Sequence, residues 1–344
     1  MPLPSAPRPP APAPVPPGAP RGPFRAFLLA AGLGTRLRPL TDLHPKPLLE
    51  VGGLTLLDRC LALLAVHGVA PHEVLVNAHH LWEQVAAWAE ARGVGLQVEL
   101  PEVLGTGGAL RAARDRLAPE VVVLNGDILC DVDLGALLAA LPADGAALAL
   151  REDPRLGAAA PVEADAAGVV TRMRDFAGAP GPGRPGTHFT GVYAISRSVI
   201  DRVPPGAACI LRSAVAEILP TRRVRAVLHR GLWEDIGAPA QLLDAQLLAA
   251  RSPGGLPGGV GPGYRGLPYD VLLGPGAHVA EGARLRGCVI GAGAQVAAGA
   301  SLDGCAVWPG VRVGVGAWRR SLLWGAPGEA ARALEVDALA PARV

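Results

Sequence analysis

An internal repeat near the C-terminus is the feature of this sequence that most restricts its fold. The segment 276–290 recurs as 293–307, and a third copy, 310–323, is one residue shorter. In each copy an apolar residue returns about every six positions among glycine and alanine, as Val279 and Leu285 do. This hexapeptide period predicts a short left-handed parallel β-helix, because each coil buries its apolar residues against the next. A solenoid this short needs to dock on another domain or subunit to be stable.

Upstream of the repeat, short apolar runs alternate with amphipathic stretches. The strand-like runs are 25–31, 73–77, 95–100 and 121–127. The helical stretches are 54–67, 81–92 and 107–117. This alternation predicts a doubly wound, Rossmann-like α/β sheet, in which ligands bind beyond the carboxyl ends of the strands. We interpret the more irregular stretch 146–228 as a mixed continuation of that sheet.

Changes in composition divide the chain into segments. Residues 1–23 hold eleven prolines and little that could pack, which predicts a disordered Pro/Ala-rich tail. Glycine and proline mark a linker at 251–269. The predicted division is the tail 1–23, an α/β domain at 24–250, the linker 251–269, the β-helix at 270–325 and a C-terminal tail at 326–344.

Charge and cysteine content exclude several classes of protein. The chain carries 32 basic and 30 acidic residues, so its net charge of +2 gives no general field that attracts nucleic acid. No apolar run reaches the length of a membrane span, and the N-terminus lacks the apolar core of a secretion signal. The five cysteines lack metal-ligand spacing, which predicts buried free thiols in a reducing compartment. We therefore expect a cytoplasmic protein with no nucleic-acid or membrane partner.

A glycine-rich segment follows the first apolar run. It reads Leu-Ala-Ala-Gly-Leu-Gly-Thr-Arg-Leu-Arg-Pro-Leu-Thr at 29–41, and Pro-Lys-Pro follows at 45–47. A glycine turn after a strand lets backbone N–H groups approach a triphosphate closely. Arg36 supplies positive charge where negative charge develops on a transferring phosphoryl group, and Lys46 stands on a stiff stretch that can reach the same phosphates. Lys46 is the single lysine of the chain, which indicates a position where arginine does not serve.

The composite of Gly-x-Gly-Thr-Arg, Pro-Leu-Thr and Pro-Lys-Pro resembles the signature of the sugar-phosphate nucleotidyltransferases, also called nucleotide-sugar pyrophosphorylases. A dinucleotide-binding fingerprint fails, because Leu37 occupies the place of its third glycine, and a Walker loop would need Gly-Lys-Ser/Thr. The resemblance covers residues 25–250. It implies an enzyme that joins a nucleoside triphosphate to a sugar-1-phosphate and releases pyrophosphate.

The resemblance also implies further site residues. Leu-Gly-Thr-Gly-Gly-Ala-Leu at 104–110 resembles the family's base-binding loop. Glu102 precedes that loop and is either an acceptor for a base N–H or a solvated loop charge. Asp127, in Leu-Asn-Gly-Asp, and Asp235, in Trp-Glu-Asp-Ile-Gly, resemble the two aspartates that bind Mg²⁺. The implied nucleotide contacts are Ala31, Gly32, Gly34, Thr35, Glu102 and Gly107.

On the sugar side the sequence departs from the family's pattern. Thr190 and Gly191, in Thr-Gly-Val-Tyr, resemble the sugar-pocket segment. Many members hold the sugar's phosphate with the lysine of a Glu-Lys-Pro segment, whereas this chain has no lysine at 171–176. We expect Arg174, or else Arg172, to take over, because a guanidinium binds phosphate through two hydrogen bonds. Elsewhere in the chain, the adjacent histidines His79 and His80 are expected to be structural residues or to position other groups.

The nucleotide and the sugar stay open at this point. Pro-Lys-Pro-Leu-Leu, the 104–110 loop and the appended β-helix most resemble mannose-1-phosphate guanylyltransferases, so GTP and mannose-1-phosphate are the leading expectation. Asn-Gly-Asp and His-His also occur in uridylyltransferases that act on amino-sugar phosphates, which remain the alternative. We expect an NTP and a sugar-1-phosphate as substrates, Mg²⁺ as cofactor and a homo-oligomer.

Two other classes of protein fit less well. A non-catalytic regulatory subunit could lose its charged site residues, but Arg36, Lys46, Asp127 and Asp235 are all present. An acyltransferase working through the β-helix would call for a basic histidine and more coils, and only His278 lies in the repeat.

Overall fold

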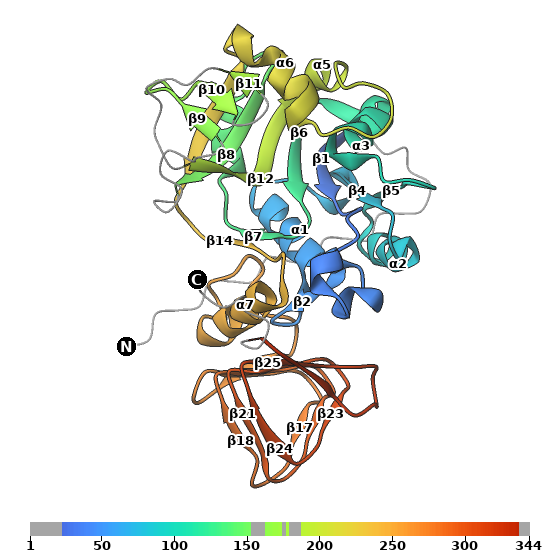
Figure 1. The fold of residues 1–344 in the computed structure, drawn as a ribbon, viewed down its shortest axis with the longest axis vertical. Helices are drawn as coiled ribbons and strands as arrows, with labels where there is room; N and C mark the ends of the chain where they lie inside the picture. Colours follow the sequence, from blue (N-terminus) through green and yellow to red (C-terminus); the bar gives the residue numbers. More distant parts are fainter. Residues whose placement is uncertain (1–22, 153–161, 174–176, 179–186, 337–344) are drawn as a thin grey trace.

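The computed structural model describes residues 23–152, 162–173, 177–178 and 187–336. They form an α/β domain with a β-helix below it in Figure 1. No helix within these ranges has the length and apolar character needed to cross a bilayer.

One mixed sheet organises the α/β domain. Its strands lie in the order β11 (Ala177–Gly178), β10 (Val170–Met173), β9 (Val162–Ala164), β12 (Thr187–Ser196), β6 (Leu117–Asn125), β1 (Phe24–Leu29), β4 (Val74–Ala78) and β5 (Gly95–Val98). β8 (Ala146–Glu152) pairs with β12, and β13 (Val224–His229) pairs with β8. Pairing is parallel from β6 to β5 and antiparallel where β12 meets β6. The predicted mixed sheet is therefore confirmed.

Helices cover both faces of this sheet. One core contains residues of α1 (Leu56–Val66), α2 (Trp82–Arg92) and α4 (Leu134–Ala140), and the other contains residues of α3 (Gly105–Ala113), α5 (Arg197–Ile200) and α6 (Ala216–Ile218). Alternate residues of β1 serve the two cores, because Leu28 belongs to the first and Phe27 to the second. Burial on both faces explains why the central strands read as continuous apolar runs.

Local interactions set the element boundaries. The predicted helix 54–67 begins at Leu56, because the Thr55 hydroxyl accepts from the Asp58 N–H over 3.0 Å and the Asp58 carboxylate accepts from the Thr55 N–H over 3.2 Å. The predicted helix 107–117 is wrong at both ends. α3 begins at Gly105, and after a 3-10 turn the buried Leu117 is already the first residue of β6.

The cysteines are free thiols, as predicted. Four of them are buried, but the prediction is wrong for Cys209, which is exposed in a surface loop. Burial raises the pKa of Cys130 to about 11, so this thiol, three residues after Asp127, stays neutral near pH 7. Cys130 is therefore not a candidate nucleophile.

The C-terminal repeat forms the predicted parallel β-helix. Its three faces are β16 (Val271–Leu273), β19 (Cys288–Ile290), β22 (Ala306–Val307) and β25 (Ser321–Trp324); β17 (His278–Val279), β20 (Gln295–Val296) and β23 (Arg312–Val313); and β18 (Arg284–Arg286), β21 (Ala300–Asp303) and β24 (Gly316–Arg319). Leu285 pairs with Leu302, but Leu302 pairs with Trp318 one position early, as the shorter third copy requires. β15 (Arg265–Leu267) and β26 (Arg332–Glu335) close the first face with antiparallel pairs.

The β-helix docks on the α/β domain, as its small size requires. One apolar cluster combines α7 (Pro239–Arg251) and β2 (Glu50–Val51) with the first face of the β-helix, and β2 forms a hairpin with β3 (Leu54–Thr55). The predicted linker 251–269 is packed in place, because the Arg59 guanidinium donates to the carbonyls of Pro257 and Gly259 over 2.8 and 3.0 Å. Because β2 follows Lys46 by only a few residues, the β-helix supports the stretch that carries this lysine.

Candidate active site

The glycine turn follows β1 at the carboxyl end of the parallel strands. Gly34 has φ +62°, and a Cβ atom there would lie 2.9 Å from Cγ2 of Thr41, so a larger residue would be strained. The Thr41 hydroxyl donates to the Gly34 carbonyl over 2.9 Å and closes the turn. Gly32 is exposed, and a Cβ atom there would meet no described atom within 4 Å. A phosphate can therefore approach the turn closely at Gly32.

Lys46 lies beside this turn. It is the first residue of a short 3-10 segment, and it stands between Pro45 and Pro47, which restrict the backbone. The residue is only 8% exposed, and its Nζ lies 2.6 Å from Oδ2 of Asp127. A predicted phosphate ligand and a predicted metal ligand therefore meet in the folded chain.

A pair of short strands brings the second predicted metal ligand next to Asp127. β7 (Ile128–Cys130) and β14 (Trp233–Asp235) pair antiparallel, with Asp235 opposite Ile128. The Ile236 N–H donates to the Asp127 carbonyl over 3.0 Å. Residues 127 and 235 are thus neighbours at one end of this two-stranded sheet.

Arg36 completes the group of predicted charged residues. It is exposed, like Thr35 before it, and its guanidinium packs on Gly237, where a Cβ atom would lie 2.8 Å from Nη2. Gly237 is two residues after Asp235, so Arg36 lies beside the segment that carries this carboxylate. Arg36 and Asp235 thus lie on segments that border the Lys46–Asp127 pair.

A cavity of about 240 Å³ opens between the glycine turn and the start of α3. Four residues that the sequence predicted for the site line it: Ala31, Gly32, Lys46 and Asp127. The other lining residues are Leu29, Ala30, Pro47, Asn77, Val103, Gly105, Thr106 and Asn125. The lining combines small and apolar groups with a few polar ones, among which the Lys46 ammonium can meet an anionic part of a ligand.

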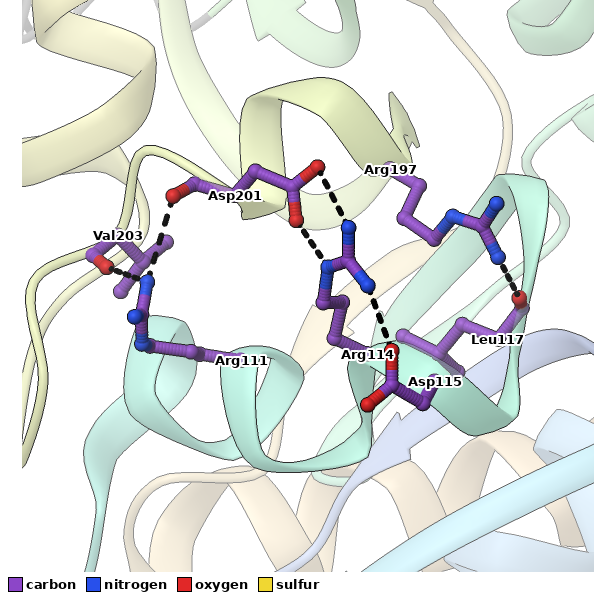
Figure 2. A network of polar contacts seen from close by, with 7 residues as sticks. All are labelled: Arg111, Arg114, Asp115, Leu117, Arg197, Asp201 and Val203. Carbon is purple, nitrogen blue, oxygen red and sulfur yellow. Dashed lines mark hydrogen bonds and ion pairs between the residues drawn. The ribbon is translucent and has the colours of Figure 1, made fainter.

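Polar contacts clamp α3 to the loop that follows α5 (Figure 2). Arg114 donates to both carboxylate oxygens of Asp201, and Arg111 donates to the Val203 carbonyl over 2.5 Å. The hydrogen bond from Arg114 holds the pKa of Asp201 below its usual value. The clamp is exposed, so it contributes more to the position of the loop than to stability.

Two predicted nucleotide contacts have other surroundings than expected. Gly107 lies inside α3, where its N–H donates to the Ala208 carbonyl over 2.8 Å and a Cβ atom would lie 2.9 Å from the Ile210 nitrogen. Gly107 therefore packs α3 on the loop after α5 and does not line the cavity. Glu102 is exposed and does not line the cavity either. The inward carboxylate is that of Glu99, three residues earlier.

Glu99 and Asn77 are site residues that sequence reasoning missed. Both are 2% exposed, and Asn77 Nδ2 donates to Glu99 Oε1 over 2.6 Å. Asn77 Oδ1 accepts from the Ala30 N–H over 2.6 Å, and Glu99 Oε2 accepts from the Leu104 N–H over 2.7 Å. These contacts join the glycine turn to the 104–110 loop across the cavity.

The two histidines also position backbone groups around the cavity. His79 Nδ1 lies 2.7 Å from the Glu99 carbonyl oxygen, and His80 Nε2 lies 2.9 Å from the Thr41 carbonyl oxygen. Their ring nitrogens thus bind the main chain of two loops that border the site.

The Glu99→Gln substitution should weaken both the fold and the site. The glutamine amide offers one oxygen where the carboxylate offers two, so either Asn77 or the Leu104 N–H loses its acceptor. We expect the free energy of unfolding to fall by about 2–3 kcal/mol, because these hydrogen bonds are buried and charge-assisted. KM for the nucleotide should rise more than kcat falls. Urea denaturation and initial-rate kinetics measure the two effects.

The matched control for this variant is Glu102→Gln. The exposed carboxylate should tolerate the change within about 0.5 kcal/mol of stability. Equal losses at positions 99 and 102 would contradict the role of Glu99. A rise in nucleotide KM for Glu102→Gln alone would instead favour Glu102 as a base ligand.

The residues predicted to contact the sugar phosphate have different surroundings in the structure. The Thr190 hydroxyl is buried and donates to the Ala149 carbonyl over 2.8 Å, so it supports the sheet. Gly191 has φ +85°, and a Cβ atom there would lie 2.8 Å from Nδ2 of Asn125, which lines the cavity. Arg172 pairs with Glu163 over 2.8 Å. Arg174 lies outside the described residues.

Comparison with known proteins agrees with this geometry. Residues 25–252 match the family model described as nucleotidyl transferase. The chain belongs to this family. The match confirms the resemblance seen in the glycine-rich segment and the prediction that this nucleotidyltransferase is an enzyme.

Relatives with known names are similar to this nucleotidyltransferase over most of its length. Mannose-1-phosphate guanylyltransferase of Mycobacterium tuberculosis is 31% identical over 278 residues, which cover 76% of this chain and 73% of that protein. N-acetylmuramate alpha-1-phosphate uridylyltransferase of Neisseria meningitidis is 33% identical over 240 residues, 66% of this chain and 98% of that protein. The crystal structure of HddC from Yersinia pseudotuberculosis shares the fold, with a TM-score of 0.52 at 23% identity over 65% of this chain and 98% of that chain.

The donor chemistry of the site fits a divalent cation, which nucleotidyltransferases of this family generally use. Asp127 and Asp235 offer the hard oxygen ligands that such cations prefer. The Lys46 ammonium already occupies the place of a cation beside Asp127. Within the described part of the chain, no three His, Cys, Asp or Glu side chains gather to hold a metal by themselves. Phosphate oxygens or water would have to supply the remaining ligands.

Proposed function

We propose that this nucleotidyltransferase joins GTP to mannose-1-phosphate, forming GDP-mannose and releasing pyrophosphate. The observation that carries the proposal is the Lys46–Asp127 pair in the cavity beside the glycine turn, because it unites a phosphate-binding cation with a metal-binding acid. The likeness to the Mycobacterium tuberculosis guanylyltransferase supports the choice of substrates. That likeness spans more residues than the family model matches, so it extends beyond the α/β domain.

The proposed reaction is a single in-line displacement. An oxygen of the sugar's phosphate forms a bond to the α-phosphorus of the triphosphate while the bond to pyrophosphate breaks. The nucleophile is already an anion, so the protein needs no general base, and its task is to position the phosphates and neutralise their charge.

Each charged residue has a part in this proposal. Lys46 and Arg36 hold the triphosphate and stabilise the charge that gathers on the leaving pyrophosphate. The open backbone at Gly32 lets the phosphates come close to the turn. Asp127 and Asp235 would hold Mg²⁺, which when bound reduces the repulsion between the two reacting phosphates.

A second candidate is uridylyl transfer to an amino-sugar phosphate. The observation that favours it is the likeness to the Neisseria meningitidis uridylyltransferase, which at 33% has the higher identity and covers almost all of that protein. Both candidates use the same charged residues, so they differ only in the base and the sugar.

Pyrophosphate release from a panel of substrates should separate the two candidates. Each of ATP, CTP, GTP, UTP and dTTP is paired with mannose-1-phosphate, glucose-1-phosphate and N-acetylmuramate-1-phosphate in the presence of Mg²⁺. We expect kcat/KM for GTP with mannose-1-phosphate to exceed every other pair by at least about tenfold, because a pocket built for one base leaves polar groups unpaired with another. A preference for UTP with the amino-sugar phosphate would establish the second candidate. No release from any pair would refute the proposed function.

We also propose that the enzyme acts in the cytoplasm as a homo-oligomer. The free thiols and the nucleotide substrate support the location. Two large apolar side chains on which we base the expected self-association are Tyr269, just before the β-helix, and Val315 within it, which are 79% and 78% exposed. Light scattering of the full chain would reject the oligomer if it gave the monomer mass at micromolar concentration.

A further inference from the structure

The ion pair in the cavity joins two groups to which the proposed function assigns different ligands. Lys46 Nζ lies 2.6 Å from Asp127 Oδ2, while the function assigns the lysine to phosphate and the aspartate to a metal ion. A divalent cation binds a carboxylate oxygen at about 2.0–2.1 Å. An ammonium left at its present place would then lie beside a charge of the same sign, and the repulsion would be large in this partly buried site.

The surroundings of the pair hold the backbone of Lys46 in place. Lys46 is 8% exposed, and Pro45 and Pro47 restrict its backbone, so only its side chain can move away. The structure also offers the metal few alternatives, because in the described ranges no group of three potential side-chain ligands exists. Asp127 is the predicted metal ligand in the cavity, and a metal ion that binds its Oδ2 displaces the lysine.

We propose that Lys46 and the divalent cation compete for Asp127, so that the nucleotide-free enzyme binds the cation weakly and the cation enters as its complex with the nucleotide. The inference rests on the proposed function for the roles of the two residues. Lys46 then acts as a built-in counterion that keeps Asp127 neutralised until phosphate arrives. The triphosphate supplies a new partner for the ammonium and the missing ligands for the metal in the same event.

The first test measures binding of Mn²⁺ alone to the full chain, by the loss of the electron paramagnetic resonance signal of the free ion. Lys46→Met keeps the length of the side chain and removes its charge. We expect it to bind Mn²⁺ at least about tenfold more tightly than the unmodified enzyme, because the competing cation is gone. Equal or weaker binding by a folded Lys46→Met variant would overturn the proposal.

Arg25→Met is the matched control, because it also removes one positive charge. Arg25 pairs with Glu73 near the start of β1, whereas the cavity lies at the other end of this strand. Its affinity for Mn²⁺ should stay within about twofold of the unmodified enzyme. A gain equal to that of Lys46→Met would mean that net charge alone sets the affinity, and would overturn competition at Asp127.

The second test needs no change to Lys46. Because Lys46 is the only lysine, acetylation with a small activated ester, followed by mass spectrometry of its peptide, reports on this one side chain. We expect saturating Mg²⁺ without nucleotide to increase the rate of Lys46 acetylation severalfold, because the displaced ammonium becomes accessible. In Asp127→Asn the rate should be high with or without Mg²⁺. A rate in the unmodified enzyme that Mg²⁺ does not change would refute the competition.

Neither test uses turnover, so the two proposals can fail separately. Enzyme that releases no pyrophosphate from any substrate pair, but whose Lys46→Met variant binds Mn²⁺ more tightly, would refute the function and keep the competition. Active enzyme whose affinity for Mn²⁺ does not depend on Lys46 would keep the function and refute the competition.

Discussion

Replacing Asp127 with asparagine is expected to lower kcat for pyrophosphate release by about a thousandfold or more. The amide keeps the shape of the side chain but loses the negative charge that a divalent cation requires, and electrostatic stabilisation of the transferring phosphoryl group is a major part of such catalysis. KM for the nucleotide should change less than kcat, because the cavity walls and the glycine turn stay in place. Initial rates at saturating substrate and metal measure the effect.

Asp131→Asn is the control for this prediction. Asp131 lies four residues further along the chain, its side chain is 53% exposed, and it faces His229 at 3.4 Å. Its loss should leave kcat within about threefold of the unmodified enzyme. Unreduced turnover in Asp127→Asn, with circular dichroism showing a folded protein, would remove Asp127 from the active site.

Replacing Arg59 with methionine is expected to cost about 3–5 kcal/mol of unfolding free energy, the largest stability effect that we predict. Arg59 is 2% exposed, and its guanidinium donates to the carbonyls of Val51, Pro257 and Gly259. Methionine fills part of the space but leaves one buried and two partly buried carbonyls without these donors. The loss falls where the β2–β3 hairpin meets the segment that leads to the β-helix.

Urea denaturation of the full chain measures this effect as a lower midpoint. Arg202→Met is the matched control, because Arg202 makes an exposed ion pair with Glu217 at 2.6 Å and its loss should cost less than about 1 kcal/mol. If both variants unfolded at the same urea concentration, the buried guanidinium would have no special part in holding the two domains together.

The two site carboxylates on the nucleotide side show how far sequence reasoning reaches. Asp127 was implied by the resemblance of Leu-Asn-Gly-Asp to the family's metal-binding segment, and it does line the cavity. Glu102 was considered either a base acceptor or a solvated loop charge, and it is exposed, whereas Glu99 directly follows β5 and turns inward. The position at a strand's carboxyl end was the better signal, because the ends of parallel strands converge on one edge of the sheet.

Other predictions depended on contacts that no local pattern reveals. Thr190 lies in a motif typical of the sugar pocket, yet its hydroxyl bonds to the neighbouring strand, because β12 runs next to β8 there. Gly107 is needed for its small size, but the group it accommodates is the backbone of the loop after α5. In both cases the residue type was informative and its partner came from a distant part of the chain.

The sequence by itself determined the classes of structure and the kinds of chemistry. Period and glycine spacing specified the α/β sheet and the β-helix, because burial of apolar side chains must follow the geometry of strands, helices and coils. The glycine spacing and the lone lysine indicated a phosphate-binding turn, and the resemblance to a known family implied the two aspartates. Only the tertiary structure decided which of these groups touch. Contacts between residues far apart in the chain depend on how whole elements pack. Examples are the Lys46–Asp127 pair, the Asn77–Glu99 hydrogen bond and the hydrogen bonds from Arg59 to Pro257 and Gly259.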